Sequence, residues 1–254
     1  MSELLLSMRD LVIEADIDGQ WSPIVKGLSM NLHKGEIIGL IGESGAGKST
    51  FGLAGMGYTK SGCRIVSGSI RLEDEELVGA SASRLREIRG NSVSYVAQSA
   101  AAAFNPAHRL IEQFVEAPVQ HGKMRGDEAA RRGQELYRQL DLPDPDSIGN
   151  RFPHQVSGGQ LQRAMTAMAM GCDPRLIIFD EPTTALDVTT QIEVLSTIKE
   201  AVRARGVAAI YITHDLAVVA QLADRIMVLR YGDLVEEGDA RNLLENPQQE
   251  YTRR

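Results

Sequence analysis

The sequence predicts an α/β fold with a mostly parallel sheet, an N-terminal antiparallel β region and an inserted α-helical subdomain. A short apolar run at residues 36–41 leads into a glycine-rich turn and then into helical periodicity, as expected for a buried strand, a loop and a helix. Strand and helix patterns alternate from residue 176 to residue 229, and such alternation builds a parallel sheet with right-handed crossovers. Between these regions, residues 109–142 carry apolar positions three and four apart, which indicates helices.

The N-terminal part is predicted to consist mainly of strands, because its apolar runs are short and bounded by turn-forming residues. A polar turn at residues 16–22 separates the first two strands, and helical character begins at Lys48. The predicted strands are residues 4–15, 27–32, 36–41, 68–73 and 92–97.

The middle of the chain is interpreted as a helical insertion, residues 98–152, which contains a loop rich in Asp and Pro at residues 141–150. The predicted elements that follow are a helix at 158–171, a strand at 176–179, a helix at 188–205, a strand at 208–213, a helix at 216–223 and a strand at 225–229. The sequence stops at Tyr251-Thr252-Arg253-Arg254 without an obvious helix cap or closing element.

Composition narrows the class of protein. The chain has 254 residues, 43% hydrophobic and 24% charged, which suits one large α/β domain or a core with a subdomain. A net charge of −7 argues against a nucleic-acid partner. Cys63 and Cys172 lie far apart without metal-ligand spacing, so we expect ordinary buried or half-buried thiols in a reducing cytoplasm. No signal peptide and no run of about eighteen apolar residues is present, so a membrane crossing would have to come from another chain or another part of a longer one.

The glycine-rich turn fits a phosphate-binding loop at every fixed position. Its sequence is Gly42-Glu43-Ser44-Gly45-Ala46-Gly47-Lys48-Ser49, followed by Thr50. Glycines let the backbone amides wrap around a β-phosphate, the lysine adds a positive charge toward the β- and γ-phosphates, and the Ser49 hydroxyl can bind Mg²⁺. Average residue frequencies would produce this pattern by accident in roughly one chain in a hundred of this length. The strand before it and the helix after it make chance a still poorer explanation.

Two adjacent acids, Asp180 and Glu181, follow a buried strand at its carboxyl end, where open α/β sheets bind their ligands. A consistent division of labour has Asp180 orienting the shell of a Mg²⁺ ion and Glu181 polarising an attacking water. The alternative is a solvated acidic turn, which the phosphate-binding loop upstream makes the poorer explanation.

A second glycine pair lies in the segment Val156-Ser157-Gly158-Gly159-Gln160. Ser157 can cap the helix that follows, and the glycines leave amides exposed at its start, which suggests a second anion site. One domain cannot easily use two such sites on one γ-phosphate, so a dimer is a plausible geometry. An ordinary capped helix start explains the same residues equally well.

Taken together, these segments resemble the nucleotide-binding domain of ATP-binding-cassette proteins, over essentially the whole chain. Residues 156–160 match the signature motif, although Val156 stands where Leu is usual. Gln98 matches the Q-loop glutamine, residues 182–187 run into the D-loop with Ala185-Leu186-Asp187, and His214 matches the switch histidine. Without the other motifs in the order typical of the family, Gln98 would be an ordinary loop glutamine, and His214-Asp215 could be a helix cap.

The resemblance implies an ATPase that uses ATP and Mg²⁺, with two cassettes packed head to tail and each ATP held between one phosphate loop and the opposite signature. It implies a catalytic group of Glu181, His214, Lys48 and Gln98 and Mg²⁺ ligands Ser49, Gln98 and Asp180. The implied nucleotide-binding residues are Gly42, Glu43, Ser44, Gly45, Ala46, Gly47, Lys48, Ser49, Thr50, Ser157, Gly158, Gly159 and Gln160. The domains are expected as a first core part at residues 1–97, a helical signature subdomain at 98–171 and a second core part at 172–254.

One departure from the family concerns adenine. An aromatic residue of the early strands usually stacks on the base, and residues 13–15 contain none. Trp21 is the nearby candidate, since its ring could serve if the turn folds back; otherwise it is a surface aromatic.

Within the family, the chain resembles the peptide/nickel importer group. The signals are Asn105-Pro106 after the Q-loop, Phe152-Pro-His-Gln before the signature, and the segment from Asn246 to Thr252. This implies an importer ATPase on the cytoplasmic face of the inner or plasma membrane, peripheral to permease subunits that a substrate-binding protein feeds, with residues 104–110 at the permease. The family usually continues beyond Tyr251-Thr252, so the chain is expected to be a truncated form or the first half of a tandem protein.

The main alternative is the ATPase of a soluble complex such as the carbon–phosphorus lyase accessory ATPase, which also resembles the peptide group. DNA-repair and translation-factor cassettes would need features absent here, namely coiled-coil or zinc insertions and a second cassette with a charged linker. A small-molecule kinase would lack the segment from Ser157 to Gln160. The sequence leaves open whether the solute is a peptide, nickel or an opine, and whether the partner cassette is a copy of this chain.

Overall fold

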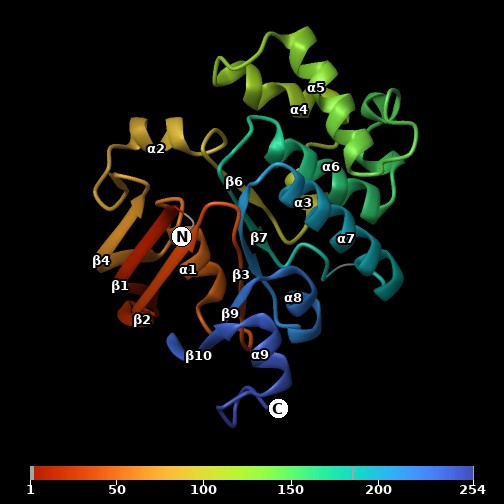
Figure 1. The fold of residues 1–254 in the computed structure, drawn as a ribbon. Coiled ribbons are helices and arrows are strands. Elements are labelled where there is room, and N and C mark those ends of the chain that lie inside the picture. Colours follow the sequence, from red (N-terminus) through yellow and green to blue (C-terminus); the bar gives the residue numbers. More distant parts are fainter. Residues whose placement is uncertain (1–2, 185, 254) are drawn as a thin grey trace. The chain divides into compact units, whose positions relative to one another are not determined.

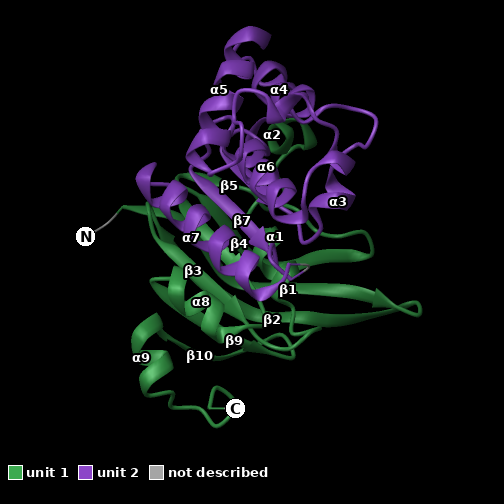
Figure 2. Ribbon diagram, turned by 90° about the vertical axis from the view of Figure 1, so that its right-hand side faces the viewer, with its two compact units in different colours: residues 1–86, 208–254 green, residues 87–207 purple. Residues whose placement is uncertain are grey.

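The structure, a computed structural model, describes residues 3–184 and 186–253. It forms two compact units, one of residues 1–86 and 208–254 and the other of residues 87–207, coloured separately in Figure 2. The functional division at residues 97/98 and 171/172 stays a prediction.

The first unit contains an antiparallel sheet whose strand order is β2-β1-β4-β5; Figure 1 labels β1, β2 and β4 of this sheet. Its strands are β1 (Leu4–Ile17), β2 (Gln20–His33), β4 (Cys63–Leu72) and β5 (Glu75–Glu76). The expected N-terminal antiparallel β region is therefore confirmed. The turn between β1 and β2 is much tighter than the predicted 16–22, because only Asp18 and Gly19 lie between the strands and both have positive φ.

The same unit contains the central strand β3 (Ile37–Ile41), which is buried at all five positions. It pairs in parallel with β8 (Ala208–Ile212) and with β9 (Arg225–Arg230), and β10 (Asp233–Asp239) adds to β9 in antiparallel fashion. The helices here are α1 (Lys48–Ala54), α2 (Ala82–Ile88), which runs past the boundary of the unit, α8 (Leu216–Leu222) and α9 (Ala240–Glu245). A Cβ at Gly39 of β3 would lie 2.1 Å from Val219 Cγ2, so this glycine lets α8 pack directly on the strand.

The second unit has the parallel strands β6 (Val93–Val96) and β7 (Leu176–Asp180) and a group of helices. These are α3 (Ala100–Ala103), α4 (Leu110–Gln120), α5 (Gly126–Gln139), α6 (Gly158–Met170) and α7 (Val188–Ala204), with 3₁₀ turns at Ile148–Asn150 and Pro153–Gln155. Phe114 and Tyr137 meet edge to face in its core, with ring centroids 6.0 Å apart. The helical periodicity predicted for residues 109–142 is confirmed as the pair α4 and α5.

Several short elements escaped the sequence analysis: β5, α2, α3, β10 and α9. Each is short or has weak periodicity, and β10 is a mostly polar edge strand that exists through its pairing with β9. Asp239 caps α9, because its carboxylate accepts hydrogen bonds from the amides of Arg241 and Asn242 at the start of that helix.

Two further expectations concern thiols and membranes. Cys63 is half-buried and Cys172 is buried, and both are free thiols. Across residues 3–184 and 186–253, no helix combines the length and the apolarity that a membrane crossing would require.

Candidate functional site

The glycine-rich loop connects β3 to α1 in the first unit. Gly42 and Gly47 have φ values of 149° and 89°, in the region that favours glycine. A Cβ at Gly42 would lie 2.1 Å from the Leu229 carbonyl oxygen, and one at Gly47 would lie 2.5 Å from that of Ile24. Both positions therefore require glycine for two reasons, the backbone conformation and the close approach of neighbouring strands.

Lys48 is the first residue of α1, and its side chain turns back over the loop. The residue is only 5% exposed, and Nζ donates to the carbonyl oxygens of Gly42 (2.7 Å) and Glu43 (2.9 Å). Ser49 and Thr50 follow it in the first turn of the helix and are half-buried. The loop thus holds a positive charge and hydroxyl groups beside its backbone amides, which is the chemistry that binds phosphate.

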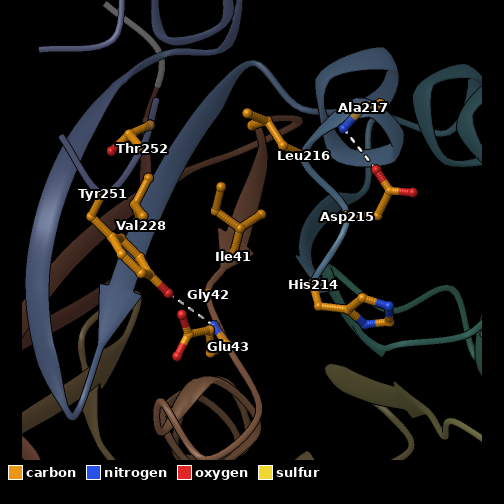
Figure 3. A pocket seen from close by; sticks show the side chains of 10 residues that line it. All are labelled: Ile41, Gly42, Glu43, His214, Asp215, Leu216, Ala217, Val228, Tyr251 and Thr252. Carbon is orange, nitrogen blue, oxygen red and sulfur yellow. Dashed lines mark hydrogen bonds between the residues drawn. The ribbon is translucent and has the colours of Figure 1, made fainter. Parts of the chain in front are cut away.

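A cavity of about 580 Å³ lies beside this loop within the first unit. Its lining includes Glu43, His214 and Tyr251, and Figure 3 shows their side chains. Asp215 caps α8, because its Oδ1 accepts from the amides of Ala217 (2.8 Å) and Val218 (3.2 Å). The helix-cap alternative therefore holds for Asp215, while His214 lines the cavity at the end of β8.

The acidic pair lies in the second unit, at the end of β7. Asp180 is 6% exposed and its Oδ2 accepts a hydrogen bond from the Tyr95 hydroxyl at 3.0 Å. Glu181 has φ of 47°, a left-handed conformation that is uncommon for a residue with a side chain and that clusters at functional sites. The two carboxyl groups are thus held by different partners.

Gln98 and Glu181 come together in this unit. Gln98 Nε2 donates to Glu181 Oε2 at 3.3 Å, and the Thr184 hydroxyl donates to the same oxygen at 3.2 Å. Two of the residues predicted to act together are therefore in contact although 83 positions separate them. Hydrogen bonds to a carboxylate oxygen hold the orientation of the carboxyl group.

The signature segment starts α6. Ser157 Oγ accepts from the Gln160 amide at 3.3 Å, and Gln160 Oε1 accepts from the Ser157 amide at 3.0 Å, a reciprocal capping box. Ser157 and Gly158 are exposed, whereas Gly159 is buried, and a Cβ there would meet Thr190 Cγ2 of α7 at 2.6 Å. The segment is therefore a capped helix start, as one of the two explanations holds. The exposed start of α6 is also compatible with the other explanation, a second anion site.

The predicted D-loop runs into α7. Ala185 lies outside the described residues, and Leu186 has its Cδ2 within 3.3 Å of where a Cβ at Gly158 would stand. Asp187 caps α7 by accepting from the Thr190 amide (3.0 Å) and hydroxyl (2.7 Å). The hydrogen bond from the Thr190 hydroxyl has the largest effect on the pKa of Asp187, and together with that from the Thr190 amide it lowers this pKa below its usual value.

Trp21 is 42% exposed on β2, and the Arg64 guanidinium carbon lies 4.0 Å from the centre of its ring. Arg64 also pairs with Glu14 at 2.8 Å. One face of the indole is therefore occupied by a cation, and the role of Trp21 in adenine stacking stays a prediction.

The predicted Mg²⁺ ligands are Ser49 in the first unit and Gln98 and Asp180 in the second. They offer a hydroxyl, an amide and a carboxylate, the hard oxygen donors that Mg²⁺ prefers. Among the described residues, no cluster of three or more His, Cys, Asp or Glu side chains could hold a metal ion. The donor set therefore fits an ion that also takes oxygens from a bound phosphate, as in nucleotide sites.

Sequence reasoning missed three residues that contact the predicted ones: Tyr95, Thr184 and Tyr251. Tyr95 and Thr184 donate to Asp180 and Glu181, and the Tyr251 hydroxyl accepts from the Glu43 amide at 3.2 Å. A signal existed for Thr184, which lies three residues after Glu181. No local pattern connects Tyr251 to a loop 208 positions earlier.

Comparisons with known proteins give a family match, similar sequences and similar structures. Residues 25–184 match the family model described as "ABC transporter". The chain is 38% identical over 252 residues to "Oligopeptide transport ATP-binding protein OppD" of Lactococcus lactis subsp. lactis (strain IL1403), covering 99% of this chain and 75% of that protein. It is 40% identical over 231 residues to "Oligopeptide transport ATP-binding protein AppD" of Bacillus subtilis (strain 168), covering 91% and 70%.

Two solved structures share the fold. One is a dimeric ATP-binding cassette in a post-hydrolysis state bound to ADP and Pi, with a TM-score of 0.81, 24% identity and coverage of 93% of this chain and 99% of that chain. The other is cbiO1 from Clostridium perfringens, part of the transporter complex cbiONQ, with a TM-score of 0.81, 23% identity and coverage of 96% and 92%. The predicted fold class is confirmed.

Proposed function

The chain belongs to the ABC transporter family and is an ATPase of the ABC type, and from this premise we propose that it energises the uptake of a peptide-like solute through a separate permease. The observation that carries the proposal is the match of 99% of the chain to an oligopeptide transport ATP-binding protein. A dipeptide transport ATP-binding protein, DppD of Bacillus subtilis (strain 168), matches the same share at 38% identity. A nickel or opine solute remains the finer alternative within the same importer group.

The reaction we propose is hydrolysis of ATP to ADP and phosphate, by in-line attack of water on the γ-phosphate. The loop of the first unit would bind the phosphates through its backbone amides and Lys48, whose ammonium group the loop carbonyls already hold. Ser49, Gln98 and Asp180 would hold Mg²⁺, which would supply positive charge to the phosphate oxygens. His214 would sense the γ-phosphate from the end of β8.

Glu181 is the proposed general base. Its carboxylate oxygen is oriented by the Gln98 amide and the Thr184 hydroxyl, so a water bound at the other side of the carboxyl group would meet a fixed acceptor. Through the same contact, Gln98 would link the state of the nucleotide to the helical region that contains it. The unusual backbone conformation of Glu181 supports a functional rather than a purely structural role.

A second ATP-binding cassette is the proposed partner for the signature segment. Ser157 and Gly158 are exposed at the start of α6, a helix of 13 residues whose amide end attracts anions. The solved cassette bound to ADP and Pi is a dimer. We propose that Ser157 of one cassette reaches the γ-phosphate held by the other, whether that other cassette is the same or a different chain.

The permease would dock on residues 105–109. These five residues are all exposed, and they lie between the buried anchors Phe104 and Leu110. Asn105 is fixed in place, because its amide donates to Gln113 Oε1 at 2.8 Å and its carbonyl accepts from Gln113 Nε2 at 3.1 Å. An exposed but rigid loop of this kind suits a protein contact. The protein would then lie at the cytoplasmic face of the membrane, indirectly served by a substrate-binding protein.

The experiment that tests the proposal measures the ATPase activity of the chain in lipid vesicles that hold candidate peptide-importer permease subunits, together with a peptide-binding protein. Peptide added with the binding protein should raise the ATPase rate, and an Asn105→Ala, Gln113→Ala variant should lose that stimulation while keeping basal hydrolysis. Basal ATPase activity that neither the permease nor the peptide changes, together with co-purification in a soluble multi-protein complex, would favour the alternative, a soluble-complex ATPase of the carbon–phosphorus lyase kind.

A further inference from the structure

The turn that follows α9 is clamped to β10 by Glu236. Its Oε1 accepts from the Gln248 amide at 2.7 Å, and its Oε2 accepts from the Gln249 amide at 3.1 Å. Although burial opposes the shift, the Thr252 side chain and the hydrogen bonds from these two amides lower the pKa of Glu236 overall. The carboxylate therefore stays ionised at neutral pH and holds residues 248–252 against the unit.

This clamp presents Tyr251 to the phosphate-binding loop. The Arg230 guanidinium carbon lies 4.7 Å from the centre of the Tyr251 ring and 5.1 Å from that of Tyr231, so the arginine stacks on both tyrosines. The Tyr251 hydroxyl accepts the Glu43 amide hydrogen at 3.2 Å (Figure 3).

The Glu43 amide belongs to the same peptide group as the Gly42 carbonyl. That carbonyl accepts from Lys48 Nζ at 2.7 Å. One planar peptide group is thus held at both polar ends, by Tyr251 at its N–H and by Lys48 at its C=O. Rotation of the group, which Gly42 permits more readily than any other residue would, breaks both hydrogen bonds at once.

We propose that Tyr251 is a positioning residue for nucleotide binding: its hydroxyl fixes the Gly42–Glu43 peptide group, and through that group it fixes the ammonium of Lys48. The inference rests on the proposed nucleotide function of the loop and adds a residue to it. A lysine already in place loses less conformational entropy when phosphate arrives, so the loss of Tyr251's hydroxyl weakens nucleotide binding. It leaves the chemical step nearly unchanged, since the lysine contacts bound ATP before and during the reaction.

The test compares Tyr251→Phe with Tyr231→Phe in the 254-residue chain. Both substitutions remove one hydroxyl and keep a ring for Arg230, but only Tyr251 contacts the loop. A fluorescent ADP analogue gives the dissociation constant, steady-state hydrolysis gives KM and kcat, and thermal unfolding gives Tm. For Tyr251→Phe we expect Kd and KM to rise about threefold to tenfold, the effect of one hydrogen bond, with kcat within about twofold. Tyr231→Phe should match the wild type.

Glu236→Gln provides a second arm, because an amide can accept only one of the two backbone hydrogen bonds that Glu236 accepts. It should raise Kd in the same direction, by loosening the turn that carries Tyr251. The inference is overturned if Tyr251→Phe binds ADP as tightly as the wild type, or if it changes Tm without changing Kd and KM. Failure of the wild-type chain itself to bind nucleotide would instead overturn the proposed function, and this inference with it.

Discussion

Gln98 donates a hydrogen bond from its side-chain amide to the carboxylate of Glu181, with 3.3 Å between Nε2 and Oε2. The donor follows β6 and the acceptor follows β7, and these strands pair in parallel with Val96 opposite Phe179. The parallel register therefore explains the contact, because it brings the carboxyl ends of both strands to one edge of the sheet. The residue proposed to link the nucleotide state to the helical region, Gln98, is thus in direct contact with the proposed base, Glu181.

Glu181→Gln should abolish most hydrolysis while preserving ATP binding. The substitution keeps the size of the side chain and a carbonyl oxygen for Gln98 and Thr184, but it removes the basic carboxylate. We expect kcat to fall by about 10²- to 10⁴-fold, the usual contribution of a general base. Phosphate release under saturating Mg-ATP measures it. Glu193→Gln, an exposed glutamate on α7, is the control and should retain full activity. If Glu181→Gln hydrolyses ATP at a rate within about tenfold of the wild type, Glu181 is not the base, because the loss of a general base lowers the rate by about 10²-fold or more.

In the Glu181→Gln background, added Mg-ATP should convert a monomer into a dimer in sedimentation velocity, since unhydrolysed ATP remains between the two cassettes. Ser157→Arg should abolish this dimer, because a large side chain would fill the exposed start of α6. Ser157→Ala is the control for Ser157→Arg. It removes the capping hydroxyl, at a cost of about 0.5–2 kcal/mol in stability, but adds no large side chain. A monomer that still binds ATP would leave the nucleotide site standing and point to a different chain as the partner cassette.

Gly159→Ala should destabilise the second unit, whereas Gly126→Ala should not. An alanine Cβ at position 159 would lie 2.6 Å from Thr190 Cγ2, so either the Thr190 side chain or the packing of α6 on α7 must shift. Overpacking of this kind costs about 1–3 kcal/mol, which corresponds to a fall in Tm of several degrees. The Gly126 position, at the first residue of α5, has open space and no positive φ. Scanning calorimetry would decide, and equal melting temperatures for the two variants would contradict the proposed role of Gly159 in helix packing.

The contribution of Glu236 to stability should depend on pH. Its native-state pKa is lowered from the ordinary value of 4.5, so the unfolded chain binds the proton more readily than the folded one does. The stabilisation is therefore fully present above pH 4.5 and is lost as the pH falls through the lower native-state pKa. Urea unfolding should show wild type more stable than Glu236→Gln at pH 7 and a smaller difference at low pH. A difference that is independent of pH would refute the ionised clamp.

Much of the chemistry could be predicted because it depends on residues close together in the chain. The loop from Gly42 to Ser49 needs glycines at fixed spacing, and the capping box of Ser157 and Gln160 spans three residues. The order of these motifs then led to the family, which the comparisons confirm. Asp187 and Asp215 also cap helices within three residues of themselves, so their structural roles are local.

The sequence by itself determined the periodic elements, the phosphate-binding loop and the order of the motifs, because hydrophobic period and residue spacing are local properties. Only the tertiary structure decided that Tyr251 contacts Glu43, that Tyr95 donates to Asp180 and that β10 pairs with β9. These contacts join segments by packing and by strand register, which depend on the whole fold. In the sequence, nothing distinguishes Tyr251 from other tyrosines. In the structure, the clamp at Glu236 places its hydroxyl against the loop.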